Sequence, residues 1–257
     1  MKRRRVGLAL GGGGARGLAH IGVLQCLEEA GVPIDCVTGT SVGSLIGALL
    51  VCGYDGKELE RRARDVDWSD LVGVTWPKRG LVQAEKLERV LSELTDGKSF
   101  SDLDTPFAAV AADITTGTAV LFSQGSIAAA VRASCSVPVV FEPVEIDGRL
   151  LVDGALVNEV PGDIARDLGA EVVIGVDLNV DRTKNKRPDH LVDVLFCSFN
   201  ILIAGMSQKG KAAADVAIEP DLEGFRYADL SRIDEAIERG YAATHEKVRD
   251  IVALVGV

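Results

Sequence analysis

The segment Gly39-Thr40-Ser41-Val42-Gly43 places a serine between two glycines at G-x-S-x-G spacing. A short apolar run, 34–38, precedes it, and a nearly all-apolar helical pattern, 42–52, overlaps its end and continues beyond it. A strand, a sharp turn and a helix in this order form a nucleophile elbow, which exposes a serine hydroxyl at the edge of a sheet. The segment therefore predicts covalent catalysis on an ester-like substrate, with Ser41 as the nucleophile.

A second glycine-rich turn, 11–17, follows the first predicted strand and contains G-x-G-x-x-G as Gly12, Gly14 and Gly17. Its backbone N–H groups at a helix N-terminus suit an anion, either a dinucleotide phosphate or the oxyanion of acyl transfer. Dinucleotide binding also needs an acidic residue at the end of the second strand. Asp35 lies at the other end of that strand, so the sequence favours the oxyanion.

A nucleophilic serine needs a general base. The chain has three histidines, His20, His190 and His245. His190 falls in a charged loop and His245 in a long amphipathic helix, where solvated or packing roles are usual. His20 precedes the serine and lies on the first predicted helix, about one turn beyond Arg16.

Asp153 is the alternative base. A short apolar strand, 150–152, carries it to a turn at Gly154. A carboxylate can deprotonate a hydroxyl if burial or hydrogen bonding moves its pKa toward the working pH. These residues alone leave Asp153 equally compatible with a general base and with a turn or capping aspartate.

Strand and helix patterns alternate along the chain, which predicts a mainly parallel sheet covered by helices on both faces. Asp147-Gly148 marks a hairpin between two of the strands. The predicted strands are 5–10, 34–38, 107–113, 118–122, 144–146, 150–152, 172–178 and 216–219. The predicted helices are 15–30, 42–52, 57–71, 83–94, 126–134, 160–168, 192–204 and 229–254.

The composition argues against some classes of binding partner and indicates the cellular compartment. The 257 residues are 47% hydrophobic and carry a formal net charge of -10, which argues against nucleic-acid binding. Five dispersed cysteines without C-x-x-C spacing predict reduced thiols, a cytoplasmic location and no metal site. The longest other apolar stretch, 191–206, includes Asp193 and is shorter than a membrane span, so we expect no transmembrane segment. The stretch favours a buried helix over a helix that lies on a membrane surface.

Several motifs together resemble the patatin-like phospholipases. The resemblance covers roughly residues 5–180, and its motifs occur in the family's order and approximate spacing. The matching segments are 12–17, 39–43, 112–117, 133–138, 141–144 and Asp153-Gly154-Ala155. One position departs from the family's pattern: Gly11 stands where several members carry an aspartate. Asp153-Gly154-Ala155, in place of Asp-Gly-Gly, is a variant that is also seen in the family.

The resemblance implies an α/β fold of three layers, α/β/α, in one domain over residues 1–257. It implies a Ser41–Asp153 dyad without histidine, in which Asp153 activates the nucleophile. Main-chain N–H groups would form the oxyanion hole, at Gly12, Gly13, Gly14 and Arg16. The remaining motif positions that flank these residues are Gly17, Gly39, Gly43, Gly154 and Ala155.

The implied activity is hydrolysis of phospholipids, lysophospholipids or simpler lipid esters, without metal or cofactor and with peripheral contact to lipid surfaces. Two alternatives stay open: a regulator on the same fold that only binds acyl chains, and a dinucleotide-binding protein. Two segments are candidate lids over the site, 71–81 and 179–189. The first contains Trp76 and follows Trp68, and it is equally compatible with a packing role. The sequence does not determine the acyl length, the head group or the oligomeric state.

Overall fold

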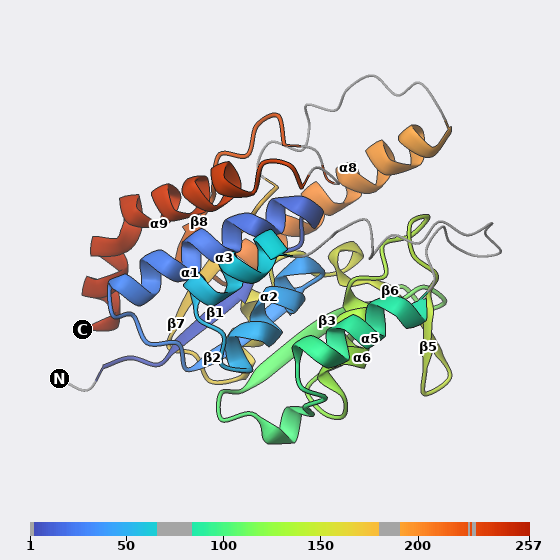
Figure 1. The fold of residues 1–257 in the computed structure, drawn as a ribbon, viewed down its shortest axis with the longest axis horizontal. Coiled ribbons are helices and arrows are strands. Elements are labelled where there is room, and N and C mark those ends of the chain that lie inside the picture. Colours follow the sequence, from blue (N-terminus) through green and yellow to red (C-terminus); the bar gives the residue numbers. More distant parts are fainter. Residues whose placement is uncertain (1–2, 66–83, 180–190, 226, 228–229) are drawn as a thin grey trace.

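The computed structural model describes residues 3–65, 84–179, 191–225, 227 and 230–257, and within these residues eight strands form one sheet (Figure 1). The strands are β1 Val6–Leu10, β2 Cys36–Thr40, β3 Phe107–Asp113, β4 Thr118–Phe122, β5 Val144–Ile146, β6 Arg149–Asp153, β7 Val172–Val176 and β8 Val216–Ile218. The α-helices are α1 Ala19–Glu29, α2 Val42–Val51, α3 Gly56–Asp65, α5 Ala84–Leu94, α6 Ile127–Ser134, α7 Gly162–Asp167, α8 Leu191–Lys211 and α9 Ile233–Val255. Short 3-10 helices are η1 Gly14–Leu18, η2 Phe100–Asp102 and η3 Gly154–Leu156.

The strand order is β5-β6-β3-β2-β1-β7-β8, with β4 paired to β3 as a branch. The strands β3, β2, β1, β7 and β8 run parallel, whereas β4, β5 and β6 join antiparallel. The fold class predicted from the sequence, a mainly parallel sheet flanked by helices, is confirmed. Because β1 and β2 are parallel neighbours, the turns that follow them open at the same edge of the sheet.

Strand β3 brings together the ends of two strands that are distant in the sequence, β2 and β6. Strand β4 occupies one edge of β3 along residues 109–113. On the opposite edge, β2 pairs up to Thr40 opposite Val110, and β6 pairs from Asp153 opposite Ala111. Strands β2 and β6 run toward each other along this edge, so their ends meet at neighbouring residues of β3. The residue after Thr40 therefore lies beside Asp153.

The core follows the alternation of side chains along the strands. Val6, Leu8 and Leu10 of β1 belong to the larger buried cluster, which includes residues of α1, α2 and α9. The intervening Ala9 faces a smaller cluster that includes Ala165 of α7. Figure 1 shows α1 and α9 side by side, and the Arg4 N–H before β1 donates to the Val255 carbonyl at the end of α9 at 3.0 Å.

Several boundaries differ from those predicted. The first helix was expected over 15–30, but its start is the 3-10 helix η1, and α1 begins at Ala19. The second strand lies at Cys36–Thr40 instead of 34–38, because its pairing with β1 begins at Cys36 and its pairing with β3 continues to Thr40. Helix α8 continues to Lys211, beyond the expected 204.

Some expectations fall outside the described residues. These are the lid candidate 71–81, all of the lid candidate 179–189 except Asn179, both tryptophans, and the end of the helix expected over 57–71. Within the described ranges, no helix combines the length and the apolar character that crossing a bilayer requires.

Candidate active site

Ser41 occupies a strained turn between β2 and α2. Its backbone has φ 53° and ψ -129°, a conformation that non-glycine residues rarely adopt. The flanking glycines are required by close backbone contacts, since a Cβ on Gly43 would lie 2.1 Å from the Leu10 carbonyl oxygen. The Ser41 N–H donates to Ser134 Oγ at 2.8 Å, which fixes the turn from the side of α6. The strand, tight turn and helix that the sequence predicts are thus present at this position, and the role of Ser41 as nucleophile stays a prediction.

Asp153 meets this serine at the end of β6. The Ser41 hydroxyl donates to Asp153 Oδ2 at 2.6 Å, and the Ala155 N–H donates to Oδ1 at 2.9 Å. Both side chains are buried, Ser41 at 3% and Asp153 at 0% exposure. A Cβ on Gly154 would lie 2.1 Å from the Val110 carbonyl oxygen, so the turn after Asp153 passes directly against β3. The Ala155 N–H therefore holds Oδ1 of the carboxylate in place, and Oδ2 faces the Ser41 hydroxyl.

The glycine loop after β1 runs beside Ser41. A Cβ on Gly12 would lie 3.2 Å from Ser41 Cβ, which places the loop at van der Waals distance from the serine. Among the described residues, the N–H groups of Gly12 and Gly13 have no hydrogen-bond acceptor. Gly14 has a φ of 59° and lies against Tyr227. Two free donors beside a serine are the arrangement that an oxyanion needs.

Arg16 has acceptors of its own within the protein. Its main-chain N–H donates to the Gly13 carbonyl at 3.3 Å. Its guanidinium donates to the Phe225 carbonyl through Nε at 3.2 Å and Nη2 at 3.0 Å, and Nη1 lies 3.5 Å from Asn179 Oδ1. The structure thus gives Arg16 the contacts of an anchor for the loop, in place of the expected main-chain donor to the oxyanion.

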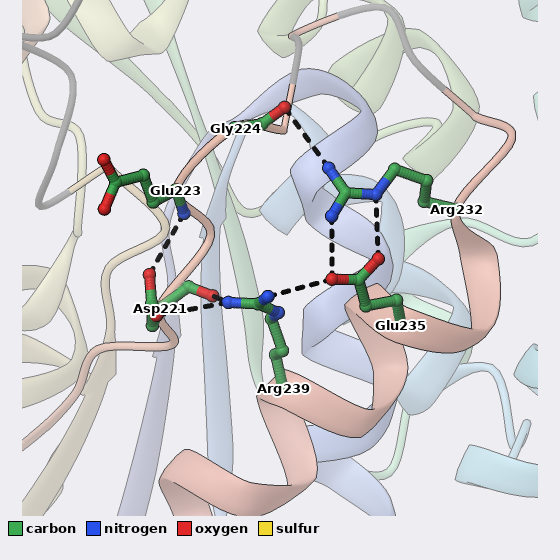
Figure 2. A network of polar contacts seen from close by, with 6 residues as sticks. All are labelled: Asp221, Glu223, Gly224, Arg232, Glu235 and Arg239. Carbon is green, nitrogen blue, oxygen red and sulfur yellow. Dashed lines mark hydrogen bonds and ion pairs between the residues drawn. The ribbon is translucent and has the colours of Figure 1, made fainter.

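The segment that receives Arg16 is tied to α9 by a charged network (Figure 2). Glu235 accepts from Arg232 at 2.7 and 2.8 Å and from Arg239 at 2.9 Å, and Arg239 also donates to the Asp221 carbonyl at 2.7 Å. The Arg232 guanidinium lies 3.8 Å from the centre of the Phe225 ring. These contacts hold the C-terminal segment in place as a support for the glycine loop.

His20 and His245, the two histidines among the described residues, make contacts away from the Ser41 hydroxyl. His20 is fully buried and its Nε2 lies 2.8 Å from the Gly11 carbonyl oxygen. His245 stacks on Tyr241 with ring centres 6.1 Å apart, and His190 lies outside the described residues. The Ser41 hydroxyl donates to a carboxylate instead. Within the described ranges, no three His, Cys, Asp or Glu side chains are grouped as metal ligands.

Sequence reasoning missed several residues around the site. Ser134 lies in a segment that carried the family resemblance, yet its contact with the elbow depends on tertiary packing. Asn179 and Glu159 are buried, and the Asn179 amide donates to the Glu159 carboxylate. Asn179 follows β7 at the carboxyl edge of the sheet, where ligand sites of open α/β sheets gather, and that position was an available signal.

Comparison with known proteins identifies the family. The profile of the family described as Patatin-like phospholipase matches residues 8–166. The chain belongs to the patatin-like phospholipase family. The matched segment contains the glycine loop, the elbow and Asp153. The expected resemblance is therefore confirmed, whereas the roles of the individual residues stay a prediction.

Relatives of this patatin-like chain include much longer proteins. Human patatin-like phospholipase domain-containing protein 6 is 39% identical over 183 residues, which cover 67% of this chain and 13% of the relative. An uncharacterized NTE family protein of Mycobacterium tuberculosis is 32% identical over 268 residues, covering 93% of this chain and 46% of the relative. The chain thus spans less than half of either relative.

Solved structures share the patatin-like fold at low identity. VipD from Legionella pneumophila superposes with a TM-score of 0.69 at 14% identity, over 97% of this chain and 67% of that one. ExoU in the ExoU–SpcU complex of Pseudomonas aeruginosa gives 0.53 at 17% identity, over 98% of this chain and 52% of that one. Identities this low show a common architecture and nothing about substrates.

The burial of His20 predicts a pH dependence of stability. Burial lowers the pKa of His20 from 6.5 to about 4. As the pH falls from 6.5 toward 4, the unfolded chain binds a proton at His20 while the folded protein does not. Proton binding therefore stabilises the unfolded state, and the free energy of unfolding falls. From pH 7 to pH 4.5 we expect His20 to remove about 2 kcal/mol from the free energy of unfolding.

Urea denaturation of the wild type and of His20→Gln at both pH values measures this effect. Glutamine does not titrate, so the variant lacks this part of the acid destabilisation. Equal losses in the two proteins would contradict the assignment.

Proposed function

We propose that this chain is a serine acyl hydrolase of lipid esters that uses Ser41 as nucleophile and Asp153 as general base. One observation carries the proposal: the buried Ser41 hydroxyl donates to Asp153 Oδ2 at 2.6 Å from a strained elbow. Family membership supports a lipid ester as substrate. We also propose that residues 1–257 act as one catalytic domain in the cytoplasm.

The proposed acylation step begins when Asp153 Oδ2 takes the proton of Ser41 Oγ. The oxygen attacks the ester carbonyl carbon and forms a tetrahedral intermediate, whose oxyanion accepts from the N–H groups of Gly12 and Gly13. The bond from the carbonyl carbon to the alcohol oxygen then breaks. The alcohol leaves with the proton held by Asp153, and the acyl group stays as an ester of Ser41.

Deacylation uses the same groups in reverse order. Asp153 removes a proton from a water molecule, which attacks the acyl carbon and forms a second oxyanion beside the glycine loop. The bond to Ser41 Oγ breaks, the serine regains a proton from Asp153, and the carboxylic acid is released. The carboxylate suits both steps because the Ala155 N–H holds Oδ1 at 2.9 Å while Oδ2 faces the serine.

Removing either member of the pair tests the proposal. We expect Ser41→Ala to abolish turnover of p-nitrophenyl esters and lysophospholipids, and Asp153→Asn to lower kcat by about 10²- to 10⁴-fold through loss of the base. Steady-state rates across chain lengths measure both effects. Thermal unfolding serves as the control for the fold.

A fluorophosphonate probe locates the nucleophile independently. Mass spectrometry of the labelled wild type is expected to find the adduct on Ser41. Labelling that persists in Ser41→Ala would refute the nucleophile, and a wild type without turnover on any of these esters would favour the acyl-binding regulator.

We also propose that α8 contacts the lipid surface that holds the substrate. Val194, Leu195, Ile201 and Leu202 are between 45% and 63% exposed. Their spacing of one and seven residues puts them on one side of the helix. Helix α8 contacts η3, which begins directly after Asp153, and Figure 1 shows its N-terminal end projecting from the sheet. The helix that carries the apolar stripe thus packs against the turn that follows Asp153.

Introducing charged residues into this stripe should weaken binding to lipid vesicles without changing the rate of ester hydrolysis. In Ile201→Asp/Leu202→Asp we expect co-sedimentation with phosphatidylcholine vesicles to fall at least about tenfold, because two apolar side chains lose their burial. Turnover of a short soluble ester should stay at the wild-type value. Leu121→Asp on β4 is the matched control, since Leu121 is 48% exposed and lies on a different element. Undiminished vesicle binding would contradict this role of α8.

A further inference from the structure

Two carbonyl groups of the glycine loop are held by buried side chains. The Gly11 carbonyl oxygen lies 2.8 Å from His20 Nε2. The Gly12 carbonyl oxygen accepts from Asn179 Nδ2 at 2.7 Å. His20 is 0% and Asn179 is 3% exposed, so water does not compete for either contact. The loop is therefore fixed at two successive peptide groups from inside the protein.

Holding a carbonyl also orients the next N–H group. In a planar trans peptide, the carbonyl of one residue and the N–H of the next point in opposite directions. The described chain has no cis peptide bond. The contact of His20 with the Gly11 carbonyl therefore fixes the direction of the Gly12 N–H, and Asn179 fixes the Gly13 N–H in the same way.

These two N–H groups are the proposed oxyanion donors. We infer that His20 and Asn179 are positioning residues, which orient the Gly12 and Gly13 N–H groups for the oxyanion without touching the substrate. The inference rests on the proposed function and deepens it. It also gives His20 a role that does not require it to act as the base.

The orientation of both side chains is determined by their surroundings. A carbonyl oxygen only accepts, so the proton of neutral His20 must be on Nε2. Burial lowers the pKa of His20 to about 4, which keeps the ring neutral at pH 7. Asn179 Nδ2 donates to the Glu159 carboxylate as well as to Gly12, so its amide nitrogen faces two acceptors.

Further contacts hold Asn179 in place. Its N–H donates to Asp177 Oδ1 at 2.8 Å, and Asp177 Oδ2 pairs with Lys211 Nζ at 2.6 Å. Its Oδ1 lies 3.5 Å from Arg16 Nη1. The side chain that orients the Gly13 N–H is thus connected to β7, α8 and the anchor of the loop, and a change of its rotamer would break several contacts at once.

Four variants separate the positioning role from a general effect on stability. Gln places an amide nitrogen near the position of His Nε2, whereas Asn is too short, so His20→Gln should keep the donor and His20→Asn should lose it. Asn179→Leu keeps the side-chain shape without the donor. His245→Asn replaces a histidine that stacks on Tyr241 and serves as the matched control.

We expect His20→Asn and Asn179→Leu to lower kcat for a p-nitrophenyl ester about tenfold to a hundredfold at unchanged KM, since a misoriented donor stabilises only the transition state less well. His20→Gln and His245→Asn should keep kcat within about twofold. The inhibition constant of a trifluoromethyl ketone, which forms an oxyanion on the serine, should rise by the same factor as kcat/KM falls. Thermal unfolding of each variant identifies any that fails to fold. If only one of the two loss variants, His20→Asn and Asn179→Leu, folds, that variant alone tests the inference.

Unchanged kcat and inhibition constant in a folded Asn179→Leu or His20→Asn would overturn the inference, and so would a fall in kcat without weaker ketone binding. Ser41→Ala in the same assay distinguishes this result from failure of the proposed function. If turnover depends on Ser41 and the loss variants keep full rates, only the positioning role is refuted. If the wild-type turnover does not depend on Ser41, the dyad and the positioning role fall together.

Discussion

The contact between Ser41 and Asp153 depends on a single feature of the sheet, the shared edge of β3. Strands β2 and β6 approach each other along that edge and end opposite Val110 and Ala111. Two side chains 112 residues apart in the chain are thereby brought to 2.6 Å. Backbone hydrogen bonds of a buried sheet hold this geometry, so the pair does not rely on flexible loops for its alignment.

Local patterns in the sequence were sufficient for the elbow, the glycine loop and most elements, because each depends on residues close together in the chain. The glycines around Ser41 are required by backbone contacts, and the apolar periodicity of β1 and α2 follows from burial. Asp153 could be selected only through the family's motif order. Its pairing with Ser41 is a property of strand register, which the residues around Asp153 do not encode.

Other features could not be predicted because distant segments create them. The start of the first helix is a 3-10 turn whose Ala15 N–H donates to the Tyr227 carbonyl, and Arg16 reaches the Phe225 carbonyl. Both acceptors belong to the C-terminal part of the chain, beyond the segment that carries the family motifs. Asn179, which donates to the Gly12 carbonyl, likewise follows the last matching motif, Asp153-Gly154-Ala155. The glycine loop after β1 is thus supported by residues from the last third of the protein.

The central claim is that Asp153 removes the proton of Ser41. The rate of Ser41 phosphonylation by a fluorophosphonate, followed by intact mass in the wild type and in Asp153→Asn, tests it without a substrate of known identity. The account predicts that the adduct still forms on Ser41 in the variant but at least about a hundredfold more slowly. Equal phosphonylation rates in the two proteins would contradict it.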